Sequence, residues 1–144
     1  IQYNSSLPQP PAKPGDYLNR TLEAIEIHDV RRVIVDLRFN AGGNLMLMRN
    51  AFGRMLREDV FKQPEALYVI TGPITFSAGL FHAANLKQNG NAIIVGDLAG
   101  DDLDFWAEGR PSFTLPNSTI RIAAQTGFHS YSKAERPEFA ESLY

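Results

Sequence analysis

The amino-acid sequence predicts an α/β fold with a largely parallel sheet. Three short runs rich in β-branched residues, at positions 33–37, 67–71 and 92–95, are typical of strands buried in a sheet. Segments with the apolar spacing of helices lie between these runs. Strands that are connected through helices pair in parallel, so we expect the three runs to be neighbours in one sheet.

Three segments are predicted to be helices. The first follows a proline-rich, extended lead-in over residues 7–15, and Asp16 is its expected N-cap. Apolar residues at helical spacing mark the second helix, over residues 45–55. The third is expected to begin near residues 75–77 and to end at the asparagine–glycine pair 89–90, a typical C-terminal signal. The predicted order is therefore helix, strand, helix, strand, helix, strand.

The remainder of the chain is predicted to be a loop and a hairpin. Residues 97–108 hold five acids and no base, which indicates a solvated loop. Residues 113–115 and 119–123 flank a Pro-Asn-Ser turn and form the expected hairpin. With 144 residues, the chain is expected to be a single domain. Because it starts with Ile1 and not with Met, we expect this domain to be truncated at its N-terminus.

Composition excludes several classes of function. Lys and Arg total 14 against 16 Asp and Glu, and a formal charge of −2 provides no basic field that would gather nucleic acid. The absence of cysteine excludes disulfides, thiolate zinc sites and cysteine nucleophiles. No apolar run approaches the roughly 20 residues of a membrane-spanning helix. The acidic run lacks the spacing of an EF-hand, and we expect neither a metal site nor a cofactor.

A first candidate site is the segment DLRFNAGG, residues 36–43. It follows a predicted strand, contains the glycine pair Gly42 and Gly43, and precedes a predicted helix. Backbone N–H groups at such a turn can point at an anion or at a developing oxyanion, because glycine permits close approach. The same pattern also fits a tight strand-to-helix connection whose glycines only provide positive φ angles.

A second candidate site is the segment TFSAG, residues 75–79, at the start of the third predicted helix. A hydroxyl at Ser77 would lie near a helix N-terminus, and the N–H of Ala78 could bind an oxyanion. Alternatively, Ser77 or Thr75 could simply cap the helix. The segment is not the Gly-x-Ser-x-Gly elbow of α/β-hydrolases, because Thr75 stands in place of the first glycine.

Together, the segments VDLRFNAGG (residues 35–43) and TFSAG (residues 75–79) resemble the tail-specific (C-terminal-processing) serine peptidase family. Residues 2–4, 94–96 and 113–118 also match the family in the expected order. The resemblance therefore spans most of the chain.

The resemblance implies a fold similar to the ClpP/crotonase superfamily, a core of repeated ββα units. It implies that Ser77 is the nucleophile and that backbone N–H groups of Gly42 or Gly43 and of Ala78 bind the oxyanion. The implied substrate is a peptide or protein, and the implied location is periplasmic or extracellular.

The sequence departs from the family at the general base. Where many members have a lysine, 25 residues after the serine, this chain has Asp102. Lys87 lies about 15 Å further along the third helix than Ser77, and His82 lies about 140° around it, so neither is a suitable base. His82 is instead expected to be a partly buried structural histidine.

Three further positions bear on the identity of the general base. His129 lies in the C-terminal segment and is not placed by the pattern, and Leu80 stands where some members have a glutamate. His28 is expected at the end of the first helix, where a cation is ordinary.

The leading interpretation is a serine peptidase-like hydrolase that forms an acyl-enzyme on Ser77. Its peptide would lie extended along a sheet edge or strand near the loop with Gly42 and Gly43. The alternative is a catalytically silent relative that binds a peptide or hydrophobic ligand. A third interpretation is a core whose base comes from upstream sequence or a neighbouring subunit, and we expect little peptidase activity from the chain alone.

Overall fold

The computed structural model describes residues 1–8, 13–108 and 111–132. These residues form two compact units. The first unit comprises Ile1–Asp101, and the second begins at Asp102. Both candidate segments, with Gly42, Gly43, Ser77 and Ala78, belong to the first unit.

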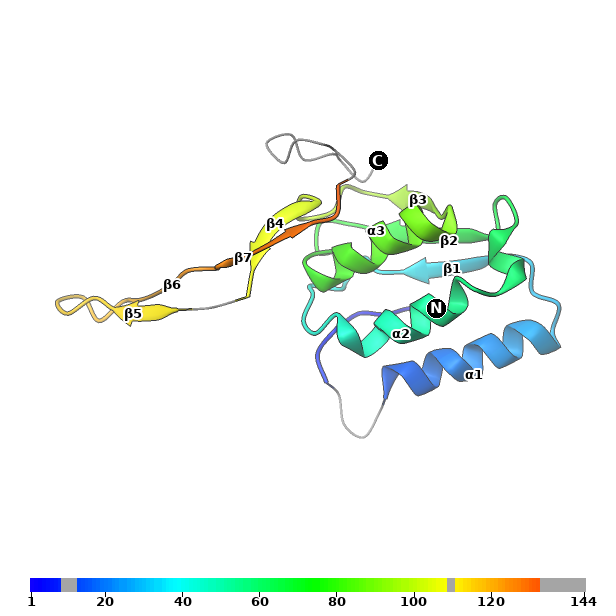
Figure 1. Cartoon of the computed structure of the whole chain (residues 1–144), viewed down its shortest axis with the longest axis horizontal. Helices are drawn as coiled ribbons and strands as arrows, with labels where there is room; N and C mark the ends of the chain where they lie inside the picture. Colours follow the sequence, from blue (N-terminus) through cyan, green and yellow to red (C-terminus); the bar gives the residue numbers. More distant parts are fainter. Residues whose placement is uncertain (9–12, 109–110, 133–144) are drawn as a thin grey trace. The chain divides into compact units, whose positions relative to one another are not determined.

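A three-stranded parallel sheet lies at the centre of the first unit (Figure 1). Its strands are β1 (Val33–Asp36), β2 (Leu67–Thr71) and β3 (Ile93–Gly96), in the order β1-β2-β3. Residues of neighbouring strands are in register, so that Val35 stands opposite Val69. The predictions of an α/β fold and of three neighbouring parallel strands are confirmed.

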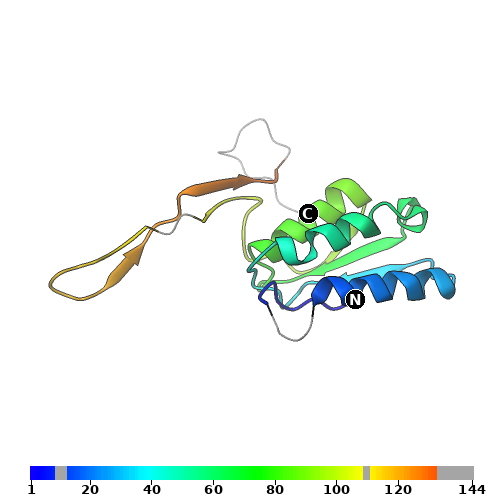
Figure 2. The same cartoon turned by 60° about the horizontal axis from the view of Figure 1, so that its bottom comes forward.

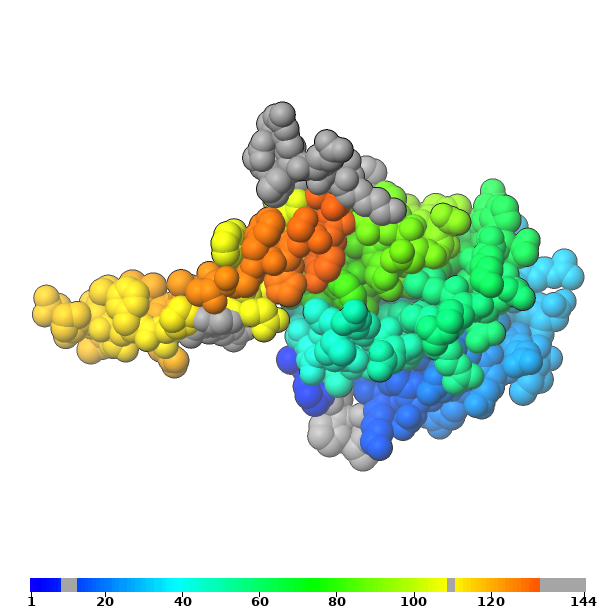
Figure 3. Space-filling view, in the orientation of Figure 1, coloured from blue at the N-terminus to red at the C-terminus, as the bar shows by residue number. Residues whose placement is uncertain are grey.

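Helices lie on one side of this sheet. The helices of the first unit are α1 (Pro14–Ile27), α2 (Met46–Met55) and α3 (Ala78–Gly90), with a short 3-10 helix η1 (Asp59–Lys62) after α2. Helices α2 and α3 lie over the same face of the sheet, and α1 runs beside α2 (Figures 1 and 2). The space-filling view shows the side chains of α1, α2 and α3 closing this side of the unit (Figure 3). None of the helices within the described residues has the length and apolar character needed to cross a membrane.

Alternation along the strands places the core between the sheet and the helices. Val33 and Val35 of β1 are buried, whereas Ile34 is 52% exposed on the opposite face. Because successive side chains of a strand point to opposite faces, β1 has one face toward the helices and one face toward solvent. Phe52 of α2 and Leu80 of α3 are fully buried in the core that results.

The first residues of the chain extend the sheet beside β1. The Asp36 N–H donates to the Ile1 carbonyl at 2.7 Å, and the Tyr3 N–H donates to the Asp36 carbonyl at 3.0 Å. The terminal ammonium of Ile1 donates to the Ile34 carbonyl at 2.8 Å. The N-terminal segment therefore covers the edge of β1.

The start of α1 differs from the prediction. The helix begins at Pro14 and not after Asp16, and its N-cap residue, Lys13, makes no side-chain capping bond. Proline at the first helical position has a suitable φ and loses no helical hydrogen bond, so the proline that was expected to belong to the lead-in begins the helix. Residues 9–12 of that lead-in lie outside the described residues.

The second unit consists of two antiparallel strand pairs. Strand β4 (Asp104–Ala107) pairs with β7 (Gly127–Ser130), and β5 (Ser112–Thr114) pairs with β6 (Arg121–Ala123). The β5–β6 pair confirms the predicted hairpin. The prediction of a loop over 97–108 is wrong for the residues of β4. The Asp104 carboxylate accepts hydrogen bonds from Tyr131 and Ser132, so it does not have to be hydrated by solvent.

Candidate active site

The glycine loop after β1 begins with an ion pair. Both carboxylate oxygens of Asp36 accept hydrogen bonds from the Arg38 guanidinium, the shortest at 2.8 Å, and Oδ1 also accepts from the Arg38 N–H. The bond from the Arg38 side chain is the main reason why the pKa of Asp36 is lowered. These hydrogen bonds between Asp36 and Arg38 fix the turn that leads from β1 into the loop.

The glycine pair lies against the N-terminal segment. Gly43 has φ +126°, and a Cβ atom on it would lie 2.5 Å from the Ser6 carbonyl oxygen. The Ser6 N–H donates to the Gly42 carbonyl at 3.1 Å, and the Asn44 N–H donates to the Ser6 carbonyl at 2.6 Å. Only glycine fits at Gly43, because two backbone segments approach closely there. The N-terminal segment thus occupies the edge beside the loop.

Thr75 links this loop to the turn before α3. Its side chain is fully buried, its hydroxyl donates to the Leu37 carbonyl at 2.9 Å, and it accepts a bond from the Gly72 N–H at 3.0 Å. The Phe76 N–H in turn donates to the Asn40 carbonyl at 3.0 Å. Two segments far apart in sequence are therefore held together by direct hydrogen bonds.

Ser77 has an unusual backbone conformation at the start of α3. Its φ is +50° and its ψ is −116°, and it makes no side-chain capping bond to the helix. A side chain other than glycine is strained in this region, and such strain is found preferentially at functional sites. The alternative interpretation that Ser77 or Thr75 caps the helix is wrong, because the Thr75 hydroxyl bonds to Leu37 instead.

The structure brings Gly42 and Ser77 into contact. Gly42 has φ +97°, and a Cβ atom on it would lie 2.7 Å from Ser77 Cβ and 3.2 Å from Ser77 Oγ. The glycine loop and the serine turn, two candidate segments far apart in the sequence, therefore lie against each other.

Three backbone N–H groups lie at this contact, those of Gly42, Gly43 and Ala78, and they differ in whether they already donate a hydrogen bond. The Gly42 N–H donates to Asn40 Oδ1 at 3.0 Å. The Gly43 N–H has no acceptor among the described residues. Ala78 is the first residue of α3, so its N–H has no acceptor within the helix. The free N–H groups of the site are therefore those of Gly43 and Ala78.

No base reaches the Ser77 hydroxyl within the first unit. Among the described residues of Ile1–Asp101, none forms a hydrogen bond with Ser77 Oγ. Lys87 lies in the last turn of α3, and Leu80 is fully buried. The site thus has a hydroxyl and free N–H groups without an adjacent proton acceptor.

His82 belongs to the core and is buried more completely than the partly buried position that was predicted for it. It is fully buried among the rings of Tyr3, Phe52 and Phe81, at centroid distances of 5.0–6.0 Å. Neither ring nitrogen has a hydrogen-bond partner, and burial lowers the pKa of His82 to about 4. A neutral, enclosed imidazole of this kind is a structural residue.

His129 and Asp102 belong to the second unit. His129 lies on β7, stacks on Phe105 at 5.5 Å, and has Nδ1 3.1 Å from the Tyr131 hydroxyl. Its Nε2 lies 4.0 Å from a Glu108 carboxylate oxygen. Asp102 is the first residue of that unit. Nowhere in the described residues do three or more His, Asp or Glu side chains gather as metal ligands.

Asn40 lies within the first candidate segment, but sequence reasoning gave it no role in the site. Its side chain is fully buried and bonds to both the N-terminal segment and the glycine loop. The only available signal was a polar residue in the short loop that connects a predicted strand to a predicted helix. Without knowledge of the fold, Asn40 looked like an ordinary turn former.

Comparisons with known proteins show similarity in fold. No protein-family model matches the chain, and neither does the sequence of any curated protein. The crystal structure of the "Putative S41 protease" from Bacteroides fragilis NCTC 9343 matches with a TM-score of 0.59 at 16% sequence identity. The match covers 97% of this chain and 44% of that one, so the chain spans less than half the length of this structural neighbour. The chain thus shares its α/β fold with part of a protein described as an S41 protease.

Proposed function

We propose that the chain is the core of a serine peptidase-like hydrolase in which Ser77 is the nucleophile. The observation that carries the proposal is the contact between Gly42 and a strained, non-capping Ser77 at the N-terminus of α3. The likeness in fold to an S41 protease supports it. The finer assignment, a ClpP/crotonase-like core of the tail-specific peptidase type, rests on the resemblance of the two sequence segments.

In the proposed reaction, Ser77 Oγ attacks the carbonyl carbon of a peptide bond. The carbonyl oxygen gains negative charge and accepts hydrogen bonds from backbone N–H groups, and the amine then leaves to give an acyl-enzyme. We assign the two donors to Gly43 and Ala78, because the Gly42 N–H is already bonded to Asn40. The N-terminus of α3 adds a favourable partial charge.

The base in this proposal comes from outside the first unit. A serine hydroxyl needs a proton acceptor within about 3 Å to be a strong nucleophile at neutral pH. The described residues of Ile1–Asp101 provide none at Ser77 Oγ. We therefore expect slow turnover unless another part of the protein brings a base to the serine.

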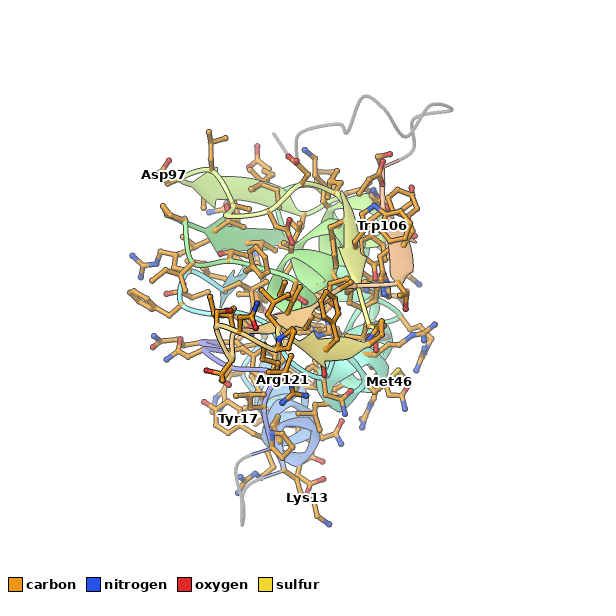
Figure 4. The ribbon with its side chains drawn as sticks, turned by 90° about the vertical axis from the view of Figure 1, so that its left-hand side faces the viewer. Lys13, Tyr17, Met46, Asp97, Trp106 and Arg121 are labelled. Carbon is orange, nitrogen blue, oxygen red and sulfur yellow. The ribbon has the colours of Figure 1, made fainter. Side chains whose placement is uncertain are left out.

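A peptide or protein with apolar side chains suits the surroundings of Ser77. Phe76, Phe39 and Met46 are 44–52% exposed, and they lie next to Ser77, within the glycine loop and at the start of α2 (Figure 4 labels Met46). On one side, the edge beside Gly42 and Gly43 is already paired with the N-terminal segment through Ser6. A peptide that is added as a strand would therefore lie elsewhere along the sheet edge or strand near this loop.

A second candidate function is binding of a peptide or hydrophobic ligand without cleavage. The observation in its favour is that no described group of the first unit hydrogen-bonds to Ser77 Oγ. The exposed side chains of Phe76, Phe39 and Met46 would serve binding equally well.

Labelling with a fluorophosphonate, followed by peptide mapping in a mass spectrometer, tests the proposal. Preorganised N–H donors and binding alone retain about 10³-fold catalysis when a catalytic triad is broken. We therefore expect slow labelling that is selective for Ser77, at least about 10-fold faster than at any other serine of the chain.

Two variants control this experiment. Ser77→Ala should abolish selective labelling, whereas Ser118→Ala, in an exposed turn of the second unit, should leave it unchanged. Labelling spread evenly over the serines would contradict the proposal and favour the binding function.

A further inference from the structure

We infer that Asn40 is a positioning residue of the proposed active site, which holds the glycine loop in the geometry that leaves the Gly43 N–H free. This inference rests on the proposed function of Ser77. It starts from a single buried side chain that connects three segments of the chain.

The side chain of Asn40 bonds to the N-terminal segment on one side and to the glycine loop on the other. Its Nδ2 donates to the Tyr3 carbonyl at 3.0 Å. Its Oδ1 accepts from the Ser6 hydroxyl at 3.2 Å and from the Gly42 N–H at 3.0 Å. Both Asn40 and Ser6 are fully buried, so water cannot replace these bonds at low cost.

The backbone of Asn40 adds the third segment. Its carbonyl accepts from the Phe76 N–H at 3.0 Å, next to Ser77. Its own N–H donates to the Leu37 carbonyl at 3.0 Å, the same oxygen that accepts from the Thr75 hydroxyl. One residue thus connects the N-terminal segment, the glycine loop and the serine turn.

The bond from the Gly42 N–H has a direct consequence for the adjacent donor. Gly42 and Gly43 both have positive φ, so their peptide units could rotate if no side chain held them. With the Gly42 N–H turned toward Asn40 Oδ1, the Gly43 N–H is left without an acceptor among the described residues. Loss of the Asn40 side chain would allow the Gly42 peptide to rotate and would therefore displace the Gly43 N–H.

Amide exchange measured by NMR tests this arrangement without reference to activity. Asn40→Ala should raise the exchange rates of Gly42 and Asn44 at least 10-fold more than those of β2. The Gly42 N–H loses its acceptor, and the Asn44 N–H bonds to the Ser6 carbonyl, whose residue loses its side-chain partner. Asn40→Asp keeps the acceptor for Gly42 and loses the donor to Tyr3. We expect an intermediate exchange rate at Gly42 for this variant.

Fluorophosphonate labelling of Ser77 in the same variants tests the link to the chemistry. A misplaced donor should lower the maximal labelling rate on the order of 10²-fold, with less than 3-fold change in the concentration for half-maximal rate. Asn40→Asp should recover part of the rate. If Asn40→Ala does not fold, the labelling rate of Asn40→Asp is compared with that of the wild type instead.

Two control variants separate positioning from loss of stability. Asn50→Asp changes an exposed amide on α2 and should leave both readouts unchanged. Leu86→Ala removes a fully buried side chain of α3 and should raise exchange throughout the unit, while folded molecules keep the wild-type labelling rate.

The outcomes distinguish the two proposals. A wild-type chain that is not labelled at Ser77 overturns the proposed function, and with it the role of Asn40 in catalysis. A labelled wild type whose Asn40 variants label at the same rate per folded molecule overturns the positioning role alone.

Discussion

Gly42 packs so closely against Ser77 that a methyl group on its Cα would lie 2.7 Å from Ser77 Cβ. This contact joins two segments that are more than thirty residues apart in the sequence. It depends on a loop with positive φ on one side and on a strained serine on the other. Gly42→Ala and Thr75→Val each perturb one support of this arrangement.

Gly42→Ala should destabilise the first unit and displace Ser77. The added Cβ would meet the Phe76 carbonyl at 3.0 Å as well as the serine, and alanine is strained at φ +97°. The expected loss in the free energy of unfolding is at least about 2 kcal/mol. Urea denaturation measures it.

Gly53→Ala is the matched control for this substitution. Gly53 lies within α2, and the nearest atom to its added Cβ would be 3.9 Å away, at Arg57. Alanine is the better helix former, so this variant should gain about 1 kcal/mol. Equal effects of the two substitutions would show that Gly42 and Ser77 are not in tight contact.

Thr75→Val should weaken the link between the two loops. The change keeps the shape of the side chain but leaves the buried Gly72 N–H without its acceptor. The Leu37 carbonyl keeps its bond from the Asn40 N–H, so the expected cost is about 1–3 kcal/mol. Thermal unfolding should show that Thr75→Ser, which retains the hydroxyl, loses less; a larger loss for serine would mean that the methyl group matters more than the bonds.

The fold was more accessible to sequence reasoning than the site. Strand β2 (Leu67–Thr71) was predicted with its observed bounds, because a β-branched run that ends at a glycine–proline pair is typical of a buried strand. Strand β4 was missed, because the partners that satisfy Asp104 come from β7 and the residues after it, over twenty residues away. Pairing at that distance leaves no local signal.

The candidate site was predicted in part. Ser77, Ala78, Gly42 and Gly43 were identified as site residues, and the first and third of them are in contact in the structure. Their catalytic roles stay predictions. Asn40 could not be identified, because its importance comes from contacts with the N-terminal segment that depend on the fold.

Stability of the first unit should fall as the pH drops from about 6.5 toward 4. Burial lowers the pKa of His82 to about 4, so the unfolded chain binds a proton in this range that the folded chain does not bind. Stability due to the neutral imidazole is therefore complete above pH 6.5 and is lost as the pH falls, by up to about 3 kcal/mol.

His82→Leu should remove this part of the pH dependence. Leucine has no ionisable group and a similar volume, and the two unpaired ring nitrogens disappear with the histidine. The difference in unfolding free energy between wild type and variant, followed from pH 7 to pH 4, isolates the contribution of His82. A constant difference over this range would show that the imidazole is accessible to protons in the folded state.

The crystal structure of the chain after complete reaction with a fluorophosphonate tests the account most directly. The phosphonyl oxygen stands in for the oxyanion of the acyl-transfer reaction. We expect the phosphorus on Ser77 Oγ, with this oxygen about 3 Å from the N–H nitrogens of both Gly43 and Ala78. A phosphonyl oxygen directed to solvent, or no adduct at Ser77 after prolonged incubation, would contradict the assignment of these residues to an active site.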